Sequence, residues 1–197
     1  ANGLTGRANR GGGLPVSLPG SGSTQPSTYL ASALGRRSEV TVVDPTPLFP
    51  FGHGLGYAAA TWGEVVAPSG PRWATDGHAE VTVDLRNEAD RSVSEVVQVY
   101  LHDVTASVVR PVQQLVGAAR VDLAPGERKR VRFTLHADLA SFTGRDLVRV
   151  VEPGAVELWL GASSSDIRAV VPFDLDGPSR EPGADRELLP TVVVEPA

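Results

Sequence analysis

The residues of this chain that could take part in chemistry are four histidines, three tryptophans and 23 carboxylates, and there is no cysteine. His53 stands between two glycines, and because histidine is the usual general base near neutral pH it is the first catalytic candidate. His78, His102 and His136 lie at predicted strand ends and lack the sequence spacing of metal ligands. This pattern predicts no metal site.

The carboxylates are distributed as surface charge is, at predicted turns and on polar strand faces. Asp103, Glu127, Glu152 and Asp166 all lie at turns, where a carboxylate accepts hydrogen bonds from nearby backbone N–H groups. Asp44, directly before a proline, is interpreted as a further turn residue. We therefore assign no catalytic role to any of them.

The tryptophans suggest another kind of site, because the faces of sugars stack on aromatic rings. The three are Trp62, Trp73 and Trp159. Trp159 alternates with Leu158 and Leu160, which places its ring on the outward face of a predicted strand. Exposed aromatic residues commonly mark interfaces, so we favour contact with a neighbouring domain over sugar binding.

Other site classes lack their motifs. The sequence GHGLG has the wrong spacing for a dinucleotide loop, GRANRGGG lacks the Lys-Ser/Thr ending of a phosphate loop, and no G-x-S-x-G elbow occurs. We expect no cofactor. A net charge of −5 without a basic stripe argues against a nucleic-acid partner. No apolar run approaches the roughly 20 residues that span a bilayer, so we expect a soluble chain, cytoplasmic or secreted, without a membrane partner.

The elements that would position these residues are strands, since apolar and polar residues alternate with a period of two. The clearest segments are 78–87, 95–102, 129–136, 155–161 and 167–175. Their predicted inward residues are Ala79, Val81, Val83, Leu85, Val97, Val99, Leu101, Val131, Phe133, Leu135, Val156, Leu158, Leu160, Ile167, Ala169, Val171, Phe173 and Leu175. Five such strands predict an all-β, antiparallel sandwich with little helix.

The regions between and around these strands are rich in turn residues. We expect weaker strands at 62–67, 117–123 and 147–152, and hairpin connections at 86–92 and 124–128, where Pro125 and Gly126 favour a tight turn. Residues 1–56 hold only short apolar pieces such as GLPVSLP. We expect these pieces to have no partner strand within the chain.

Two stretches resemble a known family. The first is LTGRANRGGGLPVSLPGSGSTQPSTYL (4–30) with DPTPLFPFGHGLGYA (44–58). It is similar to the end of the α/β-sandwich domain of family 3 glycoside hydrolases, where a G-x-LPVS-x-P strand leads to a P-L-(F/Y)-P-F-G-(H/Y)-G-L linker. The second comprises SEVVQVYLHD, RPVQQLVGAARVDLAPGE and VEPGAVELWLGASSSDIR. It resembles the fibronectin type III-like domain that closes many of those enzymes.

The resemblance implies a domain organisation. Residues 1–43 would be the remnant of the α/β-sandwich domain, 44–59 a linker, 60–176 the fibronectin type III-like domain, and 177–197 a tail with a possible edge strand. It also implies that the nucleophilic Asp and the acid/base Glu lie on absent upstream parts. The family counterpart of His53 is often Tyr, so we interpret His53 as a packing anchor.

We therefore expect the chain to be the C-terminal segment of a retaining β-xylosidase or β-glucosidase. By itself it would have a structural, domain-packing role and no activity. Its partners would be the barrel and α/β-sandwich domains upstream, and β-linked oligosaccharide would be met only through the parent. A stand-alone carbohydrate-binding or adhesive sandwich is the alternative. A partial sequence with no independent role is a third reading, suggested by the start at Ala1.

Overall fold

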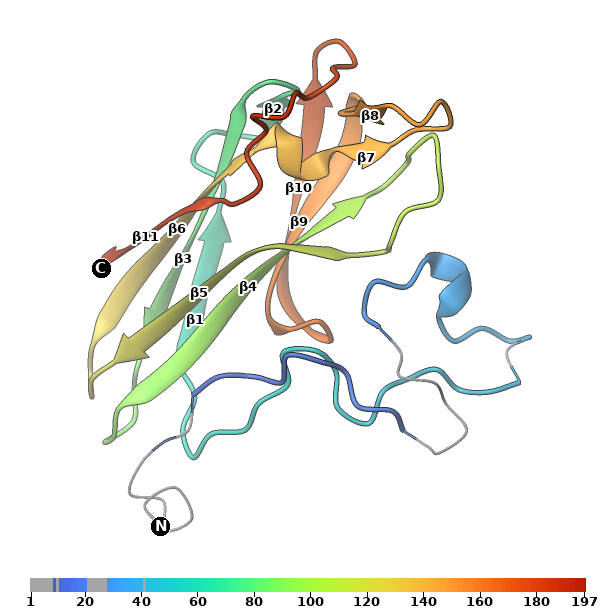
Figure 1. Ribbon diagram of the computed structural model, residues 1–197. Coiled ribbons are helices and arrows are strands. Elements are labelled where there is room, and N and C mark those ends of the chain that lie inside the picture. Colours follow the sequence, from blue (N-terminus) through green and yellow to red (C-terminus); the bar gives the residue numbers. More distant parts are fainter. Residues whose placement is uncertain (1–8, 10, 21–27, 41) are drawn as a thin grey trace.

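The computed structural model describes residues 9, 11–20, 28–40 and 42–197, which form a β-sandwich with an irregular N-terminal segment at one end (Figure 1). One sheet has the strand order β1-β3-β6-β11 and the other β2-β10-β9-β4-β5. The first consists of β1 (Thr61–Val66), β3 (His78–Arg86), β6 (Arg128–His136) and β11 (Thr191–Pro196). The second consists of β2 (Arg72–Ala74), β10 (Asp166–Asp176), β9 (Gly154–Ser163), β4 (Val93–Asp103) and β5 (Gln114–Leu123).

The remaining regular elements are short. A two-stranded ribbon pairs β7 (Phe142–Thr143) with β8 (Arg149–Val150), and the 3₁₀ turns are η1 (Ala33–Gly35) and η2 (Ala137–Ala140). Helix is therefore sparse in the described part of the chain, and none of it is long and apolar enough to cross a membrane. The prediction of an all-β sandwich is confirmed.

The core lies between the two sheets and is built from the alternating residues of the long strands. Every inward residue predicted on β3, β4, β6 and β9 is buried. On β10 the alternation also holds, but only Phe173 and Leu175 are buried, whereas Ile167, Ala169 and Val171 are half-buried. Burial of a large apolar side chain contributes roughly 1.5–3 kcal/mol, so this interface supplies most of the stabilisation.

Thr82 alternates with the inward residues Val81 and Val83, which predicts an exposed side chain, yet only 5% of it is accessible. It lies opposite Val66 on one side and Arg132 on the other. Because β3 is central in its sheet, long side chains from both neighbouring strands can shield a short residue. The period-two pattern shows which face a residue occupies, but not whether that face is covered.

The connections at 86–92 and 124–128 are not hairpins, contrary to the prediction, because each passes from one sheet to the other. The second is nevertheless a tight turn, in which Glu127 N–H donates to the Ala124 carbonyl at 3.0 Å and Gly126 has φ of 77°. Pro before a positive-φ Gly is the pattern of a type II turn. Buried Asn87 ties the two crossovers together by donating to the Leu123 and Ala124 carbonyls at 3.1 and 3.0 Å.

The edges of the sheets also differ from the simple antiparallel pattern. Strand β2 pairs in parallel with the end of β10, and its three residues are too few to show a periodicity. Strand β11 pairs along β6 and forms an edge of the four-stranded sheet. The weaker strands expected at 62–67 and 117–123 correspond to β1 and to the second half of β5.

Candidate functional site

The N-terminal segment forms a backbone ladder of its own. Leu14 N–H donates to the His53 carbonyl and Gly52 N–H to the Leu14 carbonyl, both at 2.8 Å. Further along, Leu18 and Phe49 form an antiparallel bridge. The expectation that the GLPVSLP piece has no partner within the chain is therefore wrong, because the PLFPFG piece pairs with it. We call residues 11–20 and 45–58 together the N-terminal ladder.

The N-terminal ladder packs against the outward face of β4 and the turn that joins β9 to β10. The Phe51 carbonyl accepts a hydrogen bond from Ser164 N–H at 2.9 Å. A Cβ on Gly52 would lie only 2.5 Å from the Gln98 amide nitrogen. Gly52 also has φ of 83°, so this position requires glycine both for its backbone and for the close approach.

Aromatic rings complete this contact. Tyr29 stacks on Phe51 with centroids 4.5 Å apart and meets Tyr100 edge to face at 5.8 Å. Tyr100 is fully buried and donates its hydroxyl hydrogen bond to Gln98. Burial raises the pKa of both tyrosines, so both phenols stay neutral and act as packing groups rather than as acids.

His53, the sequence candidate for a general base, is in this ladder. Its ring packs on Phe49 with centroids 4.9 Å apart. Its Nε2 is buried, and none of the described residues hydrogen-bonds to it. A general base needs a second group that orients its ring, so this arrangement supports packing more than proton transfer.

Trp159 lies on the outward face of β9, as its alternation predicted, with its Nε1 donating to Glu157 at 2.7 Å. Its ring lies near that of His102, with centroids 4.8 Å apart. A hollow of about 510 Å³ opens beside it, lined also by Tyr29, Arg36 and Gln113. The other two tryptophans are elsewhere. Trp73 is in the core, and Arg168 covers the ring of Trp62.

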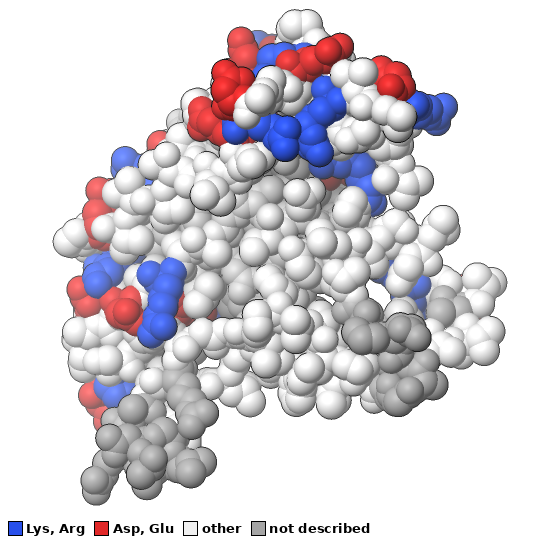
Figure 2. Space-filling view, in the orientation of Figure 1, with Lys and Arg blue, Asp and Glu red and all other residues white. Residues whose placement is uncertain are grey.

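The part of the N-terminal ladder that faces away from the sandwich is apolar. Neither of its two pieces contains a Lys, Arg, Asp or Glu, and Figure 2 shows little charge along the bottom of the view, where the ladder runs in Figure 1. Its exposed large apolar residues are Val16, Leu18, Leu48, Phe49, Leu55 and Tyr57. Neighbouring exposed apolar residues of this kind are common at interaction sites.

The carboxylates interpreted as surface charge have several different partners. Glu127 accepts a hydrogen bond from Ala124 N–H at 2.7 Å, as expected of a turn residue. Glu152 accepts from Ser107 N–H across the sheet end at 3.2 Å. Asp103, in contrast, is paired with Arg110 at 2.7 Å and is nearly buried. Its role is therefore an internal ion pair and not a turn.

Glu95 is a carboxylate that the sequence analysis did not consider. Burial raises its pKa, which a nearby Arg168 only partly opposes. A raised carboxyl pKa is typical of a general acid. Arg168, however, also pairs with Asp166 at 3.0 Å, so the two carboxylates share one guanidinium. All three side chains line a small hollow of about 120 Å³ beside the N-terminal ladder.

Two of the histidines, His78 and His136, lie together although their positions in the sequence gave no indication of it. His78 and His136 are direct cross-strand partners on β3 and β6, and their rings lie 4.8 Å apart. Glu187 from the tail lies 3.3 Å from His78. Residues 78 and 136 are far apart in sequence, so only the strand register could have revealed this cluster.

The chain is similar to a known domain family and to parts of larger glycosidases. Residues 95–164 match the Fn3-like family, the fibronectin type III-like domain. A β-xylosidase of Formosa agariphila is 38% identical over 175 residues, covering 86% of this chain and 24% of that protein. A periplasmic β-glucosidase of Salmonella typhimurium is 34% identical over 175 residues, covering 84% and 23%.

A solved structure shows the same relation. The crystal structure of a β-glucosidase from Listeria innocua superimposes with a TM-score of 0.82 and 31% identity, covering 90% of this chain and 26% of that one. Because the strands of the sandwich lie within residues 61–196, a match over 90% of the chain also includes part of the N-terminal segment. The chain spans about a quarter of the length of the relatives that it matches.

Proposed function

Since the chain belongs to the family 3 glycoside hydrolases of the β-xylosidase and β-glucosidase type, we propose that it is the docking and scaffold segment of a larger retaining β-glycosidase. The larger protein would remove terminal β-D-xylosyl or β-D-glucosyl residues. This segment, at the C-terminal side, would hold domains together and would not carry the chemistry.

The observation that carries this proposal is the two-sided N-terminal ladder. One side is fixed to the sandwich through Phe51, Gly52 and the Tyr29 ring, and the other side presents uncharged apolar residues to solvent. A free binding module has no need of such a segment. We infer that the exposed side packs on the barrel and α/β-sandwich domains of the parent protein.

The acidic residues also support a scaffold role for this segment, with the catalytic carboxylates on other domains. A retaining glycosidase uses two carboxyl groups about 5–5.5 Å apart on either side of the scissile bond. Among the described residues, the one carboxyl with a pKa raised by burial is Glu95, and its neighbouring carboxylate Asp166 is bound to Arg168. We therefore place the nucleophile and the acid on the partner domains.

The isolated chain should show no hydrolysis of aryl β-xylosides or aryl β-glucosides. Release of the aryl group is measured in parallel for the native chain, a heat-denatured sample and the variant Glu95→Gln. All three should give the background rate. Turnover by the native chain that is abolished by Glu95→Gln would instead place a catalytic acid in this segment.

A second function, carbohydrate binding, is favoured by the hollow beside Trp159, where an aromatic ring stands next to Arg36 and Gln113. If the chain is a binding module, Trp159→Ala should abolish retardation of the chain in gels that contain xylan or a β-glucan. Our docking proposal expects equal mobility with and without polysaccharide for both native chain and variant. Retardation that depends on Trp159 would favour the binding module.

A further inference from the structure

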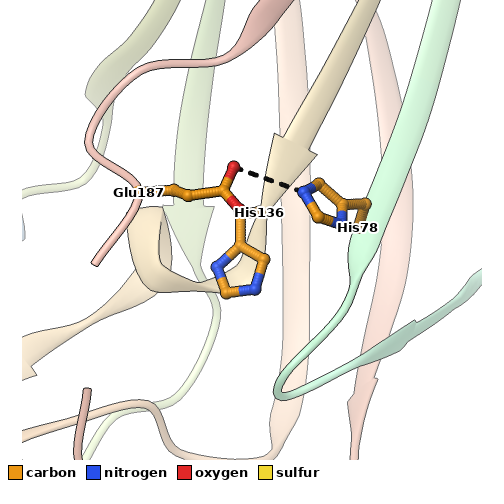
Figure 3. A group of neighbouring side chains, drawn as sticks. All are labelled: His78, His136 and Glu187. Carbon is orange, nitrogen blue, oxygen red and sulfur yellow. Dashed lines mark hydrogen bonds and ion pairs between the residues drawn. The ribbon is translucent and has the colours of Figure 1, made fainter. Parts of the chain in front are cut away.

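Three side chains converge where β3 begins, β6 ends and the tail passes over them. Figure 3 shows Glu187 directed from the tail toward His78, with His136 beside them. His78 Nε2 and Glu187 Oε2 are 3.3 Å apart, and one ligand atom from each of the three residues lies within 4.8 Å of the others. Imidazole nitrogens with a carboxylate oxygen are a donor set that Zn²⁺ prefers.

The spacing fits tetrahedral coordination. With zinc bonds of about 2.0–2.2 Å, two ligand atoms of a tetrahedral site lie about 3.3–3.5 Å apart. The His78 and Glu187 atoms already have that separation. His78 and His136 are a direct cross-strand pair on the same sheet face, and the third ligand atom lies within 4.8 Å of the other two, so a local side-chain movement can complete the site.

Asp138 contacts two members of the cluster, His136 and Glu187, and helps to position them. Its side chain is only 5% exposed, and it lies 3.0 Å from His136 Nδ1. The same carboxylate accepts the backbone N–H of Glu187 at 3.0 Å and is held by Arg180. A histidine ligand usually donates its second ring N–H to such a carboxylate, which orients the ring and leaves the other nitrogen for the metal.

Metal binding would rearrange the hydrogen bonds of His136. Without metal, its Nδ1 accepts the Asp138 N–H at 3.1 Å and its Nε2 lies 3.2 Å from the Asp76 carbonyl. Binding through Nε2 requires the other tautomer of His136, in which the proton moves from Nε2 to Nδ1 and Nδ1–H donates to the Asp138 carboxylate. The present bonds to the Asp138 N–H and the Asp76 carbonyl are then given up.

We propose that His78, His136 and Glu187 bind one Zn²⁺ ion and that Asp138 is the positioning residue of the site. The ion joins β3 and β6 to the tail segment that carries Glu187. Its role is to fasten residues 177–190 over the end of the sandwich, and binding free energy adds to folding stability because the ligands come together only in the folded chain.

The test uses the full chain without a histidine tag, stripped with a chelator and titrated with ZnCl₂ in a calorimeter. We expect one equivalent to bind and the thermal midpoint to rise, with no rise for Mg²⁺. His78→Gln combined with His136→Gln should remove the binding, and Glu187→Gln should weaken it. His102→Gln, which alters a histidine on β4, is the matched control and should bind as the native chain does.

Asp138→Asn should weaken zinc binding about 10–100-fold, as loss of an outer carboxylate does. If that variant does not fold, the weaker zinc binding expected of Glu187→Gln, a change at an exposed side chain, still tests the site. Native chain that binds no zinc saturably overturns the proposal. So does a His78/His136 double variant that keeps a native circular dichroism spectrum and binds zinc as the native chain does.

Discussion

Phe133→Ala should lower the free energy of unfolding by about 3–5 kcal/mol, as truncation of a buried phenylalanine does. Phe133 is fully buried and lies between Val81 and Val192 on the neighbouring strands. Its ring also reaches across to the other sheet, where a Cβ on Gly117 would be 3.3 Å from it. Glycine has no side chain to move into the vacated space, so the cavity would persist and the cost should be high within this range.

The measurement is equilibrium unfolding of the full chain in urea, followed by tryptophan fluorescence. Val170→Ala is the control, because it truncates an apolar residue that is 51% exposed on β10, and it should cost less than about 1 kcal/mol. Equal losses for the two variants would mean that Phe133 does not fill the space between the sheets.

The alternation of residues in the long strands was sufficient to predict the core. Val81, Val131 and Phe133 are inward in the sequence pattern and fully buried in the structure. A strand with one covered face has apolar residues at every second position, whichever strand it pairs with. The type II turn at Pro125 and Gly126 was predictable for a similar reason, since the required φ values are local.

What could not be predicted depends on partners distant in sequence. The crossovers at 86–92 and 124–128 have the composition of hairpins, and only the sheet order shows that they change sheets. The register of β3 against β6 brings His78 to His136. Neither residue has a local signal for this pairing, so the sequence pattern could not reveal that the two histidines lie together.

The burial of residues on the outward strand faces could not be predicted from the alternation either. Gln98 and Tyr100 occupy the polar side of the period on β4, yet both are buried, Gln98 against Gly52 of the N-terminal ladder and Tyr100 against the Tyr29 ring. The resemblance of residues 44–58 to a family linker named the segment without showing its position. The sequence therefore identified the segment that forms the ladder, but only the structure shows where it packs.

Asp103→Ala should destabilise the chain by about 3–5 kcal/mol, because it removes one partner of a buried ion pair and leaves the other charge uncompensated. Arg110 Nη1 lies 2.7 Å from Asp103 Oδ2, and the two side chains are only 8% and 11% exposed. The guanidinium also donates to the Ala140 carbonyl at 2.8 Å and lies over the Phe142 ring. It is thereby held in place and cannot turn out to water when the carboxylate is lost.

A double-mutant cycle separates the ion pair from the packing around it. Arg110→Met with Asp103→Ala removes both charges, so the double variant should be more stable than the sum of the two single losses implies. Asp90→Ala is the control for an exposed pair, since its side chain is 87% exposed next to Arg91, and it should leave the unfolding midpoint unchanged. If the losses at 103 and 110 were simply additive, the two charges would not be coupled. The loop between β4 and β5 would then be held by the Arg110 contacts to Ala140 and Phe142 alone.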